Sequence, residues 1–145
     1  MSIREQEELK QSYYSEAMRY MDNAKEYLKN AKKEDEFYQD KKYVKTACGT
    51  AYSGLLVALD GFLQLKNIKA KRIERKSIEF YQRTFTAIDK KMLDTLYSAY
   101  EILHLMGYYD GITSAKVIKV GFTYAYTLID RIKPTDYSEE AIIYQ

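Results

Sequence analysis

The chain has 145 residues, which fits a single domain able to bury about two-thirds of its unfolded surface. Charged residues make up 30% of it and hydrophobic residues 46%, a balance typical of folded proteins and not of disordered ones. No apolar run approaches the roughly 20 residues needed to cross a bilayer, and the N-terminus lacks the apolar stretch of a signal peptide. We therefore expect a cytoplasmic protein with no membrane partner.

Three consecutive heptads, YYSEAMR, YMDNAKE and YLKNAKK, occupy residues 13–33. A strict seven-residue repeat keeps one stripe of a helix facing a neighbouring helix, and alanines on that stripe mark where the neighbour comes close. The repeat predicts a helix from about residue 3 to residue 33, with Ser2 as its N-cap and a charged loop over residues 32–36. The alanines of the stripe are Ala17, Ala24 and Ala31.

A second helix is expected from about residue 40 to residue 66, with three distinct lines of side chains. One line is small (Ala47, Ala51, Gly54, Ala58 and Gly61) and the adjoining line is bulky (Cys48, Tyr52, Leu55, Leu59 and Phe62). The third line is polar but mostly uncharged: Thr46, Thr50, Ser53, Asp60 and Gln64. Glycine inside a helix costs about 1 kcal/mol against alanine, which implies compensating close packing on the small line. We predict that this line meets the alanine stripe in an antiparallel helical hairpin.

Helical spacing of apolar residues continues from residue 78 to residue 103 and fits one long helix or two. Thr86, with Asp89 three residues later, resembles a capping box and favours a break near residues 86–89. Gly107 and Gly111 are suited to ending a helix. Thr113 or Ser114 would cap a last helix to about residue 132, and Pro134 would end it. The predicted fold is all-α, a single-domain bundle of about five helices over residues 1–133 with a loosely held tail over residues 134–145.

Several kinds of site are excluded by composition. His104 and Cys48 are the only residues of their types, so the chain can build neither a multi-histidine metal site nor an intrachain disulfide. A Cys–His pair stays formally open, although Cys48 fits a buried reduced thiol. The glycines form no phosphate-binding loop, and we expect no metal and no cofactor. A polar site remains a candidate, set against packed or solvated roles for the same residues: Asp60, His104, Tyr108, Tyr109 and Asp110.

Basic charge gathers in the middle of the chain. Residues 41–76 carry nine basic and two acidic side chains, a net charge of +7. Such a cluster suits an acidic protein face or nucleic-acid phosphates, although no aromatic side chains alternate with it to stack bases. A solvated turn between helices is the alternative. The candidate partner-binding residues are Lys66, Lys69, Lys71, Arg72, Arg75 and Lys76.

Two segments, YVKTACGTAYSGLLVALDGFL from residue 43 and LYSAYEILHLMGYYDGITSAKV from residue 96, together resemble the helical bundles called HEPN domains, including uncharacterised small bacterial members. The resemblance implies the fold, and dimerisation or pairing with a nucleotidyltransferase. Ribonuclease members of that family carry an Arg shortly before a His, whereas Ser98, Ala99 and Tyr100 precede His104 at that spacing. Tyr108, Tyr109 and Asp110 occupy the turn where the family often carries a Tyr/Asp pair.

We therefore predict a non-enzymatic helical bundle that acts by self-association or by binding a protein partner. The alternative is a HEPN-like nuclease or nucleotide-binding component of a two-gene, toxin–antitoxin type system. A third hypothesis is a weak nucleic-acid contact through the basic turn at residues 66–76, which should weaken steeply with salt.

Overall fold

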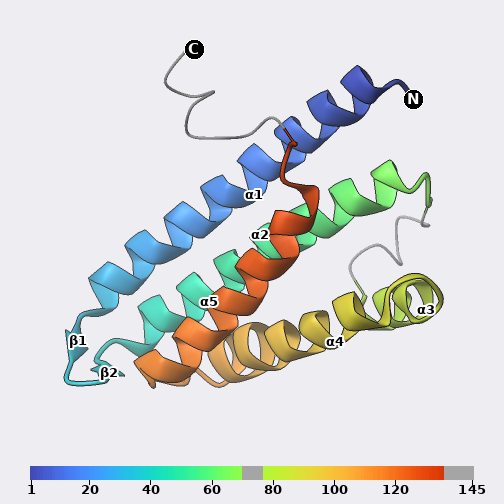
Figure 1. Ribbon diagram of the computed structural model, residues 1–145. Helices are drawn as coiled ribbons and strands as arrows, with labels where there is room; N and C mark the ends of the chain where they lie inside the picture. The colour runs from blue at the N-terminus through green and yellow to red at the C-terminus, as the bar shows by residue number, and fades with distance from the viewer. Residues whose placement is uncertain (70–76, 136–145) are drawn as a thin grey trace, which may run out of the picture.

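Helices account for most of the described backbone. The computed structural model describes residues 1–69 and 77–135, which form an all-α bundle as predicted (Figure 1). The five α-helices are α1 (Ile3–Ala31), α2 (Lys41–Leu65), α3 (Ile78–Ile88), α4 (Lys90–Ala99) and α5 (Ala115–Ile129). The smaller elements are strands β1 (Lys33–Glu34) and β2 (Phe37–Tyr38), the π-helix η1 (Tyr100–Tyr109) and the 3-10 helix η2 (Asp130–Ile132).

The predicted hairpin of two long helices is confirmed. Figure 1 shows α1 and α2 running antiparallel and side by side, with α5 lying in front of α2. The alanines of the α1 stripe are all fully buried. A Cβ added to Gly54 would lie 2.7 Å from Cβ of Tyr20, and one added to Gly61 would lie 2.7 Å from Cβ of Tyr13. The two backbones are therefore so close that only glycine fits at these positions of α2.

The segment after α1 differs from the predicted charged loop. It forms a two-stranded antiparallel hairpin in which Lys33 pairs with Tyr38 and Glu34 with Phe37. Backbone bonds tie the hairpin to the start of α5, from the Tyr38 N–H to the Thr113 carbonyl at 2.9 Å and from the Ala115 N–H to the Glu36 carbonyl at 2.9 Å. These contacts between distant segments give the charged stretch its order.

The break between α3 and α4 is confirmed, but its cap is not the predicted one. The carboxylate of Asp89 accepts a hydrogen bond from the Met92 N–H at 2.9 Å and pairs with Arg131 at 2.7 Å. Both interactions stabilise the charged form, so they lower the pKa of Asp89. The Thr86 hydroxyl instead donates to the carbonyl of Gln82 inside α3. Asp89 thus begins α4 and also anchors η2.

Gly107 does not end its helix, contrary to the sequence-based expectation. The chain continues from α4 into the π-helix η1, where Gly107 is buried against α2. A Cβ at Gly107 would lie 2.4 Å from Sγ of Cys48. Gly111, with a φ of +66°, is the glycine that turns the chain, and Ser114, not Thr113, caps α5 by accepting from the Val117 N–H.

The first residues of the predicted tail are docked on the bundle. Pro134 is buried, and Thr135 donates to the Glu7 carboxylate of α1 from its N–H at 2.9 Å and from its hydroxyl at 2.8 Å. The expectation of a loose tail is therefore wrong for these two residues, and the rest of it lies outside the described residues.

Helix α2 is long and apolar enough, by length and composition alone, to cross a membrane, which the sequence analysis did not anticipate. In the bundle, 67% of its most apolar window is buried against other helices. A core helix passes the same test as a membrane span, and the burial fits the core role.

The single thiol lies inside this core. Burial raises the pKa of Cys48 to about 12, because a low-dielectric environment disfavours the thiolate. We expect the native protein to resist a chromogenic disulfide reagent at mildly alkaline pH and to react stoichiometrically once unfolded in urea. Rapid labelling of the folded protein would contradict this packing.

Candidate functional site

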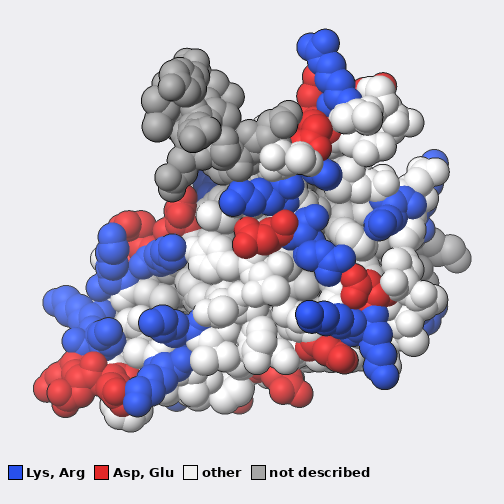
Figure 2. All heavy atoms as spheres, in the orientation of Figure 1, with Lys and Arg blue, Asp and Glu red and all other residues white. Residues whose placement is uncertain are grey.

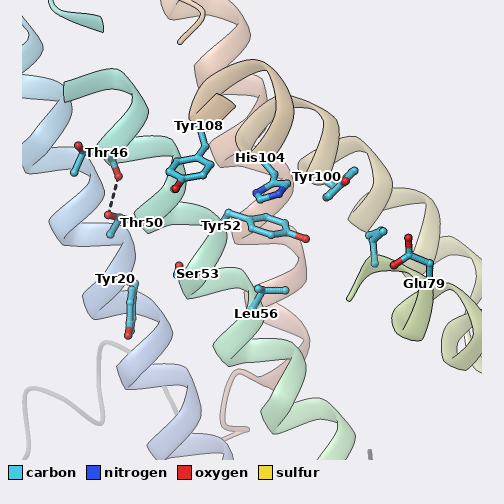
Figure 3. A pocket seen from close by; sticks show the side chains of 12 residues that line it. Tyr20, Thr46, Thr50, Tyr52, Ser53, Leu56, Glu79, Tyr100, His104 and Tyr108 are labelled. Atoms are coloured by element: carbon cyan, nitrogen blue, oxygen red, sulfur yellow. Dashed lines mark hydrogen bonds between the residues drawn. The ribbon is translucent and has the colours of Figure 1, made fainter. Parts of the chain in front are cut away.

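A hollow with a volume of about 700 Å³ lies between α1, α2, α3 and η1. We call it the aromatic groove (Figure 3). Its lining residues are Tyr20, Thr46, Gly49, Thr50, Tyr52, Ser53, Leu56, Ile78, Glu79, Tyr100, His104 and Tyr108.

The floor of the groove is the polar line of α2. Thr46, Thr50 and Ser53 line it, and the ring of Tyr108 covers the backbone at Gly49. The hydroxyls of Thr46 and Thr50 donate to the carbonyls four residues earlier in the helix, at 3.0 and 2.8 Å. Because their protons are used in this way, the two hydroxyl oxygens are left as hydrogen-bond acceptors.

The wall formed by η1 is a row of aromatic rings. The ring centroid of His104 lies 5.2 Å from that of Tyr100 and 5.8 Å from that of Tyr108, with interplanar angles of 29° and 17°. Tyr52 of α2 adds a ring at 4.9 Å. Figure 3 shows Tyr108, His104 and Tyr100 in a row with Tyr52 beneath His104, and Tyr20 of α1 on the other side of the α2 floor. Longer π-helical segments are rare and occur often at functional sites, which marks this wall as a candidate.

The surroundings of His104 favour the neutral form of its ring. Partial burial lowers the pKa of His104 from its usual value, because desolvation penalises the imidazolium. Within residues 1–69 and 77–135, no hydrogen bond reaches its ring nitrogens, and its contacts are with the faces and edges of tyrosines. The environment suits stacking and offers no group that would orient the ring as a base.

This environment predicts how His104 titrates. We expect the midpoint of its Cε1–H resonance in a proton NMR titration to lie below 6.5, the usual value for histidine. Because the folded state then binds fewer protons than the unfolded state, stability should fall as the pH drops through 6.5 and level off below the folded midpoint. A midpoint at or above 6.5 would show that the ring is solvated or paired with an acid.

The five residues of the predicted polar site do not all lie together in the structure. His104 and Tyr108 line the aromatic groove, and Tyr109 packs edge-on to His104 at 5.0 Å. Asp110 follows as the C-cap of η1, is exposed, and does not line the groove. Asp60 lines a separate hollow of about 470 Å³ and so does not join the other four.

Only part of the predicted basic surface can be placed. Lys66 follows α2 with its Nζ 5.6 Å from the ring centroid of Phe62. Lys69 lines the same hollow as Asp60. Lys71, Arg72, Arg75 and Lys76 lie outside the described residues.

The sequence did not predict a site role for Tyr20, Tyr100 or Glu79, and it predicted Tyr52 only as part of the bulky line of the second helix. The available signal was the spacing of Tyr100, His104 and Tyr108, four residues apart each time, which aligns them along one helix. Their meeting with Tyr20 and Tyr52 depends on the tertiary fold.

A second open surface is the outer face of α5. Residues 120–129 carry no charged side chain, and Val120 is 46% exposed. Figure 2 shows lysines, arginines and acids around the edge of the face that carries α5, with a largely uncharged area in its middle. Beside it, a smaller hollow of about 460 Å³ lies between α1, the β-hairpin and α5.

The described residues form no metal-binding site. Among residues 1–69 and 77–135, no group of three or more His, Cys, Asp or Glu side chains lies close enough together to hold an ion.

Comparison with known proteins places the chain in a family. Residues 12–134 match the family described as "Domain of unknown function (DUF5618)". A solved structure of a protein of unknown function from Dyadobacter fermentans is similar, with 44% sequence identity and a TM-score of 0.74. The alignment covers 85% of this chain and 94% of that one. No curated protein matches. The chain therefore belongs to the DUF5618 family.

Proposed function

We propose that the protein is a non-enzymatic binding module that holds a segment of a protein partner, either a second copy or another chain, in the aromatic groove. The observation that supports this is the groove itself, whose volume of about 700 Å³ falls within the range of ligand sites in proteins. Tyrosine is enriched in protein interfaces because its rigid ring buries much apolar area while its hydroxyl stays hydrogen-bonded. The floor offers a bound segment the hydroxyl groups of Thr46, Thr50 and Ser53.

The environment of His104 favours binding over catalysis. A nuclease must stabilise phosphate charge, yet no Lys or Arg is among the described residues that line the groove. A general base must also be oriented by a partner, and the described neighbours of His104 are rings. The HEPN-like nuclease is therefore the weaker proposal. The buried free thiol of Cys48 fits the reducing cytoplasm, which we propose as the location.

Site-specific photo-crosslinking in living cells tests the binding role. A photoreactive amino acid at Ser53, on the groove floor, should yield one discrete covalent adduct of defined mass. The same residue at Lys91, which is exposed on α4 outside the groove, serves as the matched control. Mass spectrometry of the Ser53 adduct would tell a second copy from a different protein. No adduct, or the same adducts at both positions, would contradict the proposal.

Self-association can be measured separately. If the partner is a second copy, light scattering across micromolar concentrations should show a dimer, and Ser53→Arg should return it to monomer by filling the groove. A dimer that survives Ser53→Arg would place the contact elsewhere, for which the outer face of α5 is the next surface to test.

A further inference from the structure

The aromatic groove combines aromatic rings, hydrogen-bond acceptors and one carboxylate. Aromatic rings carry negative π faces, the threonine oxygens are acceptors, and the one charged residue among its described lining is Glu79. No Lys or Arg from the described part of the chain lines it. The hollow beside Asp60 differs, because Lys69 contributes a positive charge there. The aromatic groove is thus an electron-rich surface without a described cation of its own.

We infer that the aromatic groove recognises a cationic nitrogen group, such as a methylated ammonium or a guanidinium. The group would belong either to a free amine or to a Lys or Arg side chain of the protein partner, and the second source rests on the function proposed above. Aromatic rings attract a cation that lies within about 6 Å of the ring centroid. Tyr20, Tyr108 and Tyr52 come from three different elements and surround the floor where such a group would lie.

Glu79 extends this preference to the α3 end of the groove. It is exposed, stands next to Ile78 in the lining, and makes no ion pair with any residue in ranges 1–69 and 77–135. A carboxylate at the rim attracts a cation at long range, while the rings provide close contacts after water has been displaced. The same carboxylate would repel an anion.

The single histidine supplies a clean readout. Because His104 is the only His in the chain, its Cε1–H proton gives one resonance, and this proton lies within the aromatic wall. Tetramethylammonium and guanidinium chloride at sub-denaturing concentration are the cation ligands, and choline is compared with 3,3-dimethylbutan-1-ol, its uncharged isostere. Inorganic phosphate is the anion control. We expect a saturable shift of the His104 resonance with at least one cation and weaker binding of the neutral alcohol.

Substitutions separate the charge from the shape of the groove. Tyr108→Leu should weaken cation binding by about two- to thirtyfold, the range expected for losing one ring, whereas Tyr108→Phe should keep it. Glu79→Gln should weaken it modestly and remove most of its salt dependence. Tyr27→Leu, a partly exposed α1 tyrosine outside the groove, is the matched control and should leave binding unchanged. Equal binding of choline and its alcohol, or no saturable shift with any cation, would overturn the inference.

A comparison of peptides distinguishes the two sources of the cation, a free amine and a protein side chain. A short peptide with a central Lys or trimethyl-Lys is compared with the same peptide carrying norleucine. Preference for the charged peptides over free choline would assign the site to a protein side chain, and the reverse to a free amine. If every cation fails while the Ser53 photo-adduct persists, the inference is wrong and the binding role stands. If choline binds and no photo-adduct forms, the partner proposal is the one that fails.

Discussion

Gly54→Leu is expected to lower the free energy of unfolding by about 3 kcal/mol, because overpacking a rigid contact costs this much. Even a Cβ at this position would lie 2.7 Å from Cβ of Tyr20 and 3.1 Å from the carbonyl oxygen of Ala17. Both atoms are fixed close to the α1 backbone, so the two helices would have to separate along their length. Urea unfolding followed by circular dichroism measures the loss.

Ser53→Leu is the matched control for this substitution. Ser53 is the preceding residue of α2 and is exposed, so the same side chain there should change stability by no more than about 0.5 kcal/mol. Equal effects at the two positions would mean that α1 and α2 do not approach each other closely at Gly54.

Gly107→Ala is expected to cost about 3 kcal/mol and to displace the aromatic wall of the groove. The new Cβ would lie 2.4 Å from Sγ and 2.5 Å from Cβ of Cys48, a fully buried residue of the central helix that cannot move aside. The π-helix would have to shift away from α2, carrying His104 and Tyr108 with it. Urea unfolding should show the loss, and the His104 proton resonance should move.

Gly49→Ala provides the contrast for this prediction. Its added Cβ would lie 2.9 Å from a ring carbon of Tyr108, a side chain that is 46% exposed and can turn outward. Replacing helical glycine by alanine gains about 1 kcal/mol in helix propensity, so stability should hold or rise slightly. The His104 resonance should still move, because its stacked neighbour has moved. A loss as large as that of Gly107→Ala would show that the Tyr108 ring is rigidly held.

The sequence predicted the parts of the fold that repeat. Ala17 and Gly54 belong to lines with strict spacing, and such spacing reports directly which helix face meets a neighbour. The polar line of α2 was recognised in the same way, and Thr46, Thr50 and Ser53 proved to be the floor of the groove. Breaks with a capping side chain, as at Asp89, were also within reach, although the identity of the cap was wrong.

The π-helix and the groove wall could not be predicted in the same way. Apolar spacing near Leu96, Ala99 and Leu103 fits an ordinary α-helix, so nothing local indicates a change of hydrogen-bond register. Within the π-helix, Gly107 lies against Cys48, a contact between residues far apart in the chain. The β-hairpin has the same kind of origin, since bonds to Glu36 and Thr113 order it. The spacing of residues within one segment does not indicate such distant partners.

The two hydrogen bonds from Thr135 to Glu7 bring the ends of the described chain together. Fraying at the start of α1 should therefore release the segment around Thr135, so that amide protons in the two segments exchange as one cooperative unit. A circular permutant that joins Thr135 to the start of α1 through a short flexible linker and opens the chain at an exposed turn should keep the fold.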